Sequence, residues 1–122
     1  MVSRSWVGLL CAGYRLAMPA RVVVSVEDDV LIDDGRPFDL SKLWGGPLRT
    51  AAPYAVWVQH GESVAALAVD HVSQFSSSAP MMAVSPLGLR RPQLFEGAFR
   101  ERDSIYLVVT AAALIELTAE GG

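Results

Sequence analysis

Residues 54–72 read Y-A-V-W-V-Q-H-G-E-S-V-A-A-L-A-V-D-H-V, and this stretch decides the fold. From Tyr54 to Val58 the side chains alternate with the period of two that is typical of a β-strand. The turn H-G-E-S follows, in which Gly61 can adopt a positive φ angle. Residues 64–69 are then almost continuously apolar, which predicts a strand covered on both faces. The stretch therefore predicts a β-hairpin at the centre of the fold.

Further strands are expected on both sides of this hairpin. Apolar and β-branched runs bounded by turn residues predict strands over residues 5–12, 14–18, 22–26, 30–32, 93–100 and 105–109. The acidic cluster 27–29 is expected to end the strand over 22–26, and Gly97 is expected to mark a bulge. Residues 73–86 are polar and rich in serine, which predicts a loop with one extended segment. The sequence leaves open whether residues 73–92 are ordered.

Two short helices complete the expected elements. Asp39 can cap a helix near residues 39–45, which Gly45 would end. A C-terminal helix is expected over residues 111–120, with Leu114 and Leu117 on one side. The many short strands and closely spaced turns predict a mainly β, barrel-rich fold that forms a single domain over residues 1–122.

Composition and charge favour protein partners. The formal net charge is −3, and the Lys and Arg residues are scattered, which argues against direct binding to nucleic acid. No apolar run approaches the roughly 20 residues of a membrane-spanning helix, so no direct membrane contact is expected. Cys11 is the single cysteine and is expected to be buried in the first strand. Without an intrachain disulfide or a convincing leader, a cytoplasmic location is expected.

No residue pattern predicts an enzyme. His60 and His71 have no partners at a metal-ligand spacing, so no metal site and no cofactor are expected. The five carboxylates of residues 27–34 lack the alternating spacing of a calcium loop and are expected to lie on a solvated strand edge. No nucleophile, phosphate-binding or dinucleotide motif is present, and no catalytic residue is assigned.

The order of the segments resembles the CheW family of chemosensory adaptors. The segments are Y-R-L-A-M-P (14–19), D-L-S-K-L-W-G (39–45), the central hairpin, and R-P-Q-L-F-E-G-A-F-R-E-R-D-S-I-Y-L-V-V-T-A-A-A-L-I-E-L (91–117). The resemblance implies two small SH3-like five-stranded β-barrels packed as one unit. It also implies a non-enzymatic adaptor that connects the tip of a methyl-accepting chemotaxis receptor to a CheA-type histidine kinase. The receptor tip would dock in an apolar groove at Val22, Val24 and Tyr54, although both valines also fit a plain core.

The chain also departs from that family. The segment between the second strand and the D-L-S-K-L-W-G helix is shorter, so the first barrel is expected to be reduced. The family's turn arginine aligns with Asp34, and Arg36 is the candidate to replace it. These changes predict an altered or lost kinase contact, as in the short adaptor of the Frz chemosensory system. An unpaired edge strand would also permit self-association.

Two other functions remain open at this point. The chain could be a stand-alone regulatory domain that binds a response regulator or another signalling protein on the same scaffold. It could also be a small enzyme or ligand-binding barrel, which would require a polar, convergent pocket.

Overall fold

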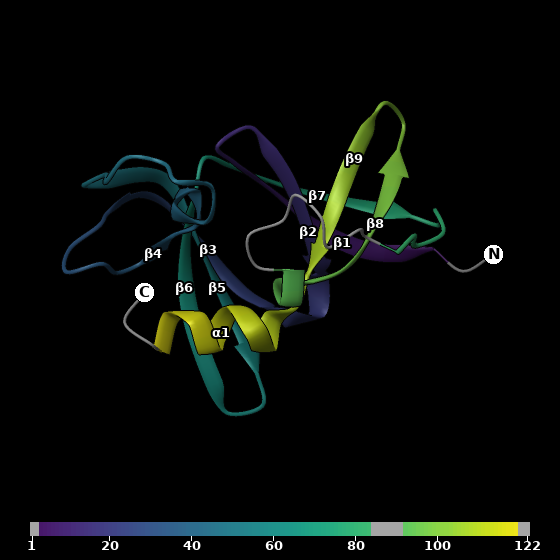
Figure 1. Ribbon diagram of the computed structural model, residues 1–122. Coiled ribbons are helices and arrows are strands. Elements are labelled where there is room, and N and C mark those ends of the chain that lie inside the picture. Colours follow the sequence, from purple (N-terminus) through teal and green to yellow (C-terminus); the bar gives the residue numbers. More distant parts are fainter. Residues whose placement is uncertain (1–2, 84–91, 120–122) are drawn as a thin grey trace.

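The computed structural model describes residues 3–83 and 92–119, and two β-sheets dominate it (Figure 1). The chain is mainly β, as predicted. None of the described helices is both long enough and apolar enough to cross a membrane. The part of the expected 73–92 loop that covers residues 84–91 lies outside the described residues.

The two ends of the chain build the five-stranded sheet, in the order β7-β1-β2-β9-β8. Its strands are β1 (Arg4–Cys11), β2 (Tyr14–Pro19), β7 (His71–Ser77), β8 (Phe95–Glu101) and β9 (Ser104–Val109). All neighbours are antiparallel except β2 and β9, which are parallel. The bulge predicted at Gly97 is present, because the register of β8 on β9 shifts between Phe95 and Gly97. Past the end of β7, Met82 pairs with Ala98 of β8.

The middle of the chain builds the four-stranded sheet, in the order β3-β5-β6-β4. Its strands are β3 (Val23–Leu31), β4 (Phe38–Asp39), β5 (Ala51–His60) and β6 (Ser63–Val69). The predicted hairpin is the central pair of this sheet, and Gly61 at its turn has a φ angle of 62°. Of the two expected five-stranded barrels, one therefore has five strands and the other has four. The reduced one contains the shortened segment, as predicted.

The second half of β6 is covered on both faces. Leu67 and Ala68 are both fully buried, although neighbouring side chains in a strand point to opposite faces. Leu67 packs into the main core with Val56 and Val58, whereas Ala68 packs into a smaller cluster around Val30. The first residues of β6 are exposed, so the prediction of a strand buried on both faces holds only for its second half.

The two predicted helices are present. The first is a 3-10 helix, η2 (Leu40–Trp44), in which Ser41 N donates to Asp39 Oδ1 at 3.0 Å and Gly45 ends the helix at a φ angle of 72°. The second, α1 (Ala111–Ala119), lies across β5 and β6 and buries Leu114, Ile115 and Leu117 (Figure 1). Two further 3-10 turns are η1 (Ala20–Val22) and η3 (Pro92–Leu94).

The acidic cluster does not end the third strand, contrary to the prediction. β3 continues to Leu31, with Glu27 opposite Ala55 and Asp28 opposite Tyr54, so the expected short strand over 30–32 belongs to it. The acidic side chains remain exposed. Pairing with β5 therefore satisfies the backbone without burying charge, and this outweighs the low strand propensity of aspartate. At its start, residue 22 belongs to η1 and not to the strand.

The expected loop after residue 72 is also partly wrong. Residues 71–77 form the full strand β7, which pairs with β1 from Leu10 to Arg4. Strand β1 is buried over most of its length and needs a partner on this side. Because β7 is an outer strand with much of its surface in solvent, serine and glutamine are tolerated there.

Candidate partner-binding site

An apolar groove lies where the first half of β3 passes β1 and β7. It has a volume of about 410 Å³ and is lined by Val7, Ala20, Val23, Val24, Ser25, Val26, Val72, Ser73 and Gln74. Val24 is 58% exposed and Val26 is 44% exposed, although both are apolar side chains. Elements of both sheets therefore form a shallow surface that presents valines to solvent.

The structure separates the four residues singled out in the sequence. Val24 lines the groove, whereas Val22 is half-buried in η1 and packs against the main core beside it. Tyr54 is half-buried on β5, where its ring meets His71 edge-on at 6.0 Å, and it is not among the groove's lining residues. Arg36 is exposed in the turn between β3 and β4 and lines a different, larger cavity.

Several groove residues were not singled out from the sequence. Val26 is two residues from Val24, and in a regular strand this spacing would place both side chains on one face. In the structure the register of β3 on β5 shifts between Val23 and Ser25, and all of residues 23–26 line the groove. Val72 and Ala20 had no such signal. They reach the groove through the pairing of β7 with β1 and through the turn η1.

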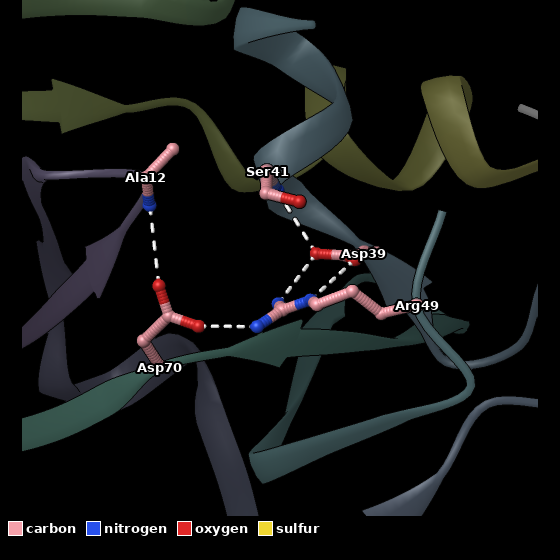
Figure 2. Close-up of polar contacts among 5 residues, drawn as sticks. All are labelled: Ala12, Asp39, Ser41, Arg49 and Asp70. Atoms are coloured by element: carbon pink, nitrogen blue, oxygen red, sulfur yellow. Dashed lines mark hydrogen bonds and ion pairs between the residues drawn. The ribbon is translucent and has the colours of Figure 1, made fainter. Parts of the chain in front are cut away.

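A polar network centred on Arg49 connects the two sheets (Figure 2). Arg49 lies between η2 and β5 and donates to both carboxylate oxygens of Asp39, from Nη2 at 2.7 Å and from Nε at 2.8 Å. Its Nη1 also donates to Asp70 Oδ1. The other oxygen of Asp70 accepts from the backbone nitrogen of Ala12, in the β1–β2 turn, at 3.2 Å. Asp70 therefore ties a turn of the five-stranded sheet to the four-stranded sheet.

This environment shifts three pKa values. Burial of Asp39 alone would raise the pKa of its carboxyl group, but the hydrogen bonds from Arg49 and Ser41 outweigh it and hold that pKa below 3.8. The hydrogen bonds to Asp39 and Asp70 raise the pKa of Arg49 further above its usual range. Burial, with the nearby charges of Asp70 and Asp39, raises the pKa of Cys11 to about 12. Cys11 is thus a neutral, buried thiol, in the strand position predicted for it.

Over residues 3–83 and 92–119, no three His, Cys, Asp or Glu side chains lie close enough together to hold a metal ion. In the network at Arg49, the charged side chains are hydrogen-bonded to one another, as expected of a network that stabilises the fold. The groove, in contrast, has exposed apolar side chains, which are the usual means of contact with another protein.

Comparison with known proteins identifies the fold. No family model matches the sequence, and no curated protein matches it either. Among solved structures, the chain is similar to the scaffolding protein CheW of Thermoanaerobacter tengcongensis, with a TM-score of 0.72 and 16% sequence identity. The likeness covers 89% of this chain and 90% of that protein. Because it extends over nearly the whole of both chains and includes both sheets, this protein has a CheW-like fold.

Proposed function

We propose that this protein is a non-enzymatic adaptor of a bacterial chemosensory array that works in the cytoplasm. It binds the signalling tip of a methyl-accepting chemotaxis receptor and modulates the coupling of that receptor to a CheA-type histidine kinase. The observation that supports this proposal most is the CheW-like fold, because the similar protein is a scaffolding protein. The exposed valines of the groove add a surface suited to a protein partner.

The receptor tip is a helical hairpin, and the groove is its proposed binding site. An amphipathic helix binds such a surface by placing its apolar face in the groove. Val24, with Val26 and Val72 beside it, would contact the helix directly. Val22 would support this surface from η1. Tyr54 does not line the groove but would extend the contact on β5, where its half-buried ring can meet a partner while its hydroxyl stays in water.

The kinase contact is the part of the function that this adaptor is proposed to lack. The support is the four-stranded sheet, because the resemblance to CheW-type adaptors implies five strands where this sheet has four. Arg36, which would take the place of the family's turn arginine, lies in the turn between β3 and β4, where its backbone pairs with Asp33. The adaptor would then resemble the short adaptor of the Frz system and alter coupling without bridging receptor and kinase.

Binding of the purified chain to two partners tests the proposal. The partners are the signalling tip of a cognate receptor and the regulatory domain of the cognate kinase. We expect binding to the receptor alone. The variant Val24→Asp should weaken it about tenfold or more, because it places a charge against an apolar helix face. Tyr54→Ala should weaken it less.

The matched control is Ile105→Asp, which puts the same charge in place of an exposed apolar residue on β9, outside the groove. An equal loss of receptor binding in Val24→Asp and Ile105→Asp would argue against the groove as the receptor site. Stoichiometric binding to the kinase domain would contradict the loss of the kinase contact. Binding to neither partner, or to a response regulator in their place, would contradict the adaptor function itself.

A further inference from the structure

The outer edge of β3 has no partner among the described residues. β3 is an outer strand of the four-stranded sheet, and it pairs with β5 and with no other described strand. In the five-stranded sheet, the pairing of Met82 with Ala98 covers part of the outer edge of β8, whereas the outer strand β7, like β3, pairs with one described strand. An uncovered edge presents backbone N–H and C=O groups to which a further strand can bind.

A large cavity adjoins the second half of this strand. Its volume is about 910 Å³, and it lies between β3, the turn of residues 34–37, Phe38 of β4 and the end of α1. Its lining on the central hairpin consists largely of small side chains, Ala55, Ala65 and Ala66, with Trp57 among them. This size falls in the usual range of ligand-binding pockets. Leu31, on its rim, is 77% exposed.

The charge of β3 restricts what can bind there. Glu27, Asp28 and Asp29 are consecutive on the strand, and Asp33 and Asp34 follow in the turn. All five side chains are exposed, and neither of the ion pairs found among the described residues involves them. Arg36 is the one cation within residues 23–38.

This charge disfavours a second copy of the chain as the partner. Antiparallel pairing of β3 with its own copy would bring together three carboxylates from each strand, and like charges opposite each other destabilise a sheet. A strand that carries Lys or Arg would instead be attracted by the same carboxylates.

We propose that the outer edge of β3 and the adjoining cavity bind an extended, basic segment of a partner protein by strand addition. Because alternate side chains of a strand point to opposite faces, apolar side chains of that segment would enter the cavity, which Glu27 lines, while its Lys or Arg side chains would lie on the opposite face with Asp28. The cavity shares no lining residue with the valine groove, and the inference does not depend on the identity of the receptor.

The test uses the full chain and two synthetic peptides of nine residues. One alternates valine with lysine, and the other alternates valine with glutamate. We expect the lysine peptide to bind, at low ionic strength, and the glutamate peptide not to bind. Hydrogen exchange measured by NMR should slow at amides of β3 when the lysine peptide is bound, because these groups become hydrogen-bonded in the new strand.

Two variants separate charge from shape. Glu27→Gln with Asp28→Asn removes two charges but keeps an oxygen that can accept from Trp57 Nε1, which now donates to Glu27 at 3.1 Å. We expect about fivefold weaker binding of the lysine peptide. Ala66→Leu should also weaken binding, without a change of charge, by filling the cavity. The control is Glu96→Gln with Asp103→Asn, which removes two exposed charges from the five-stranded sheet and should leave binding unchanged.

Several results would overturn the proposal. They are equal binding of both peptides, no binding of the lysine peptide, and binding without slower exchange in β3. The proposal would also be overturned if the chain dimerises and the double variant Glu27→Gln with Asp28→Asn dimerises more strongly. A second copy of the chain would then be the partner that binds this edge. The groove variant Val72→Ala, on β7 and so outside the strand with which the peptide pairs, should weaken receptor binding and leave peptide binding intact. Failure of this proposal and failure of receptor binding can therefore be distinguished.

Discussion

The guanidinium group of Arg49 binds two carboxylates at the C-terminal ends of neighbouring strands. Asp39 ends β4 and Asp70 follows β6, and because these two strands are parallel their C-terminal ends lie side by side. The side chain of Asp39 is 1% exposed and that of Arg49 is 25% exposed. A carboxylate buried to this extent needs its hydrogen-bonding partners, and Arg49 supplies two of the donors.

Replacement of Arg49 by methionine should destabilise the fold. The change keeps most of the side-chain length but leaves the charge of Asp39 buried and uncompensated, so we expect the free energy of unfolding to fall by about 3 kcal/mol. Urea unfolding followed by circular dichroism measures this. Arg100→Met, at an exposed residue of β8, is the control and should change stability by less than about 0.5 kcal/mol. Equal effects of the two variants would contradict a structural role for the network.

The lowered pKa of Asp39 makes a pH prediction with a definite sign. The carboxyl group has a lower pKa in the folded chain than its ordinary value of 3.8, so the unfolded chain binds the proton first as the pH falls. Its contribution to stability is complete above about pH 5 and is lost progressively below it.

The variant Asp39→Asn isolates this contribution. The difference in the free energy of unfolding between the native chain and Asp39→Asn should be large at neutral pH and should shrink as the pH is lowered toward 2. Urea unfolding at a series of pH values measures the difference. Asp103→Asn, at an exposed turn residue, should show no such trend. A difference that stays constant with pH would contradict the assignment.

At the scale of elements, the pairing of residue 82 with β8 depends on a glycine. Gly97 is buried in β8, and a Cβ atom placed on it would lie 2.7 Å from the backbone oxygen of Met82 and 2.7 Å from Met81 Cγ. The backbone bonds between Met82 and Ala98, at 2.7 and 2.9 Å, hold the segment after β7 at this distance. A side chain at residue 97 would therefore push this segment away from β8.

Gly97→Ala should accordingly destabilise the chain by about 1–3 kcal/mol, the usual cost of overpacking. Hydrogen exchange of the Met82 and Ala98 amides should become faster, because their mutual hydrogen bonds are lost. Glu96→Ala, at the exposed neighbouring residue, is the control. Unchanged exchange at Met82 in Gly97→Ala would show that the segment can shift without losing the pairing.

At the scale of the whole molecule, the two sheets share one core. The largest buried cluster includes Leu9 and Leu16 from the five-stranded sheet, Val56 and Leu67 from the four-stranded sheet, and Leu114 from α1. Neither sheet can bury its inner face without the other. The network around Arg49 adds polar connections across the same boundary.

We therefore expect the chain to unfold in a single cooperative transition, as one domain would. The thermal transitions seen by far-UV circular dichroism, by tryptophan fluorescence and by calorimetry should coincide. Leu114→Ala, which removes a fully buried side chain from this core, should lower the midpoint in all three signals together. Two separated transitions would contradict this prediction.

Much of the local structure could be read from short stretches of the sequence. The central hairpin, its turn at Gly61, the cap at Asp39 with the stop at Gly45, and the bulge at Gly97 all follow from neighbouring residues. Their causes are local, since the period of the side chains, the φ angle of glycine and the reach of a capping carboxylate act within a few residues. For the same reason the mainly β character could be predicted from the sequence, whereas the expectation of two five-stranded barrels came from the resemblance to the CheW family.

The features that depend on distant partners could not be predicted in this way. Because β3 pairs with β5, it continues through its acidic residues, and because the serine-rich segment after residue 70 pairs with β1, it forms the strand β7. Asp39, Arg49 and Asp70 meet across 10 and 21 residues of sequence, and Ala12 lies 58 residues from Asp70. The valine groove and the cavity beside β3 likewise combine residues from separate strands. The energy of such contacts depends on distances between elements, and no pattern within one element records those distances.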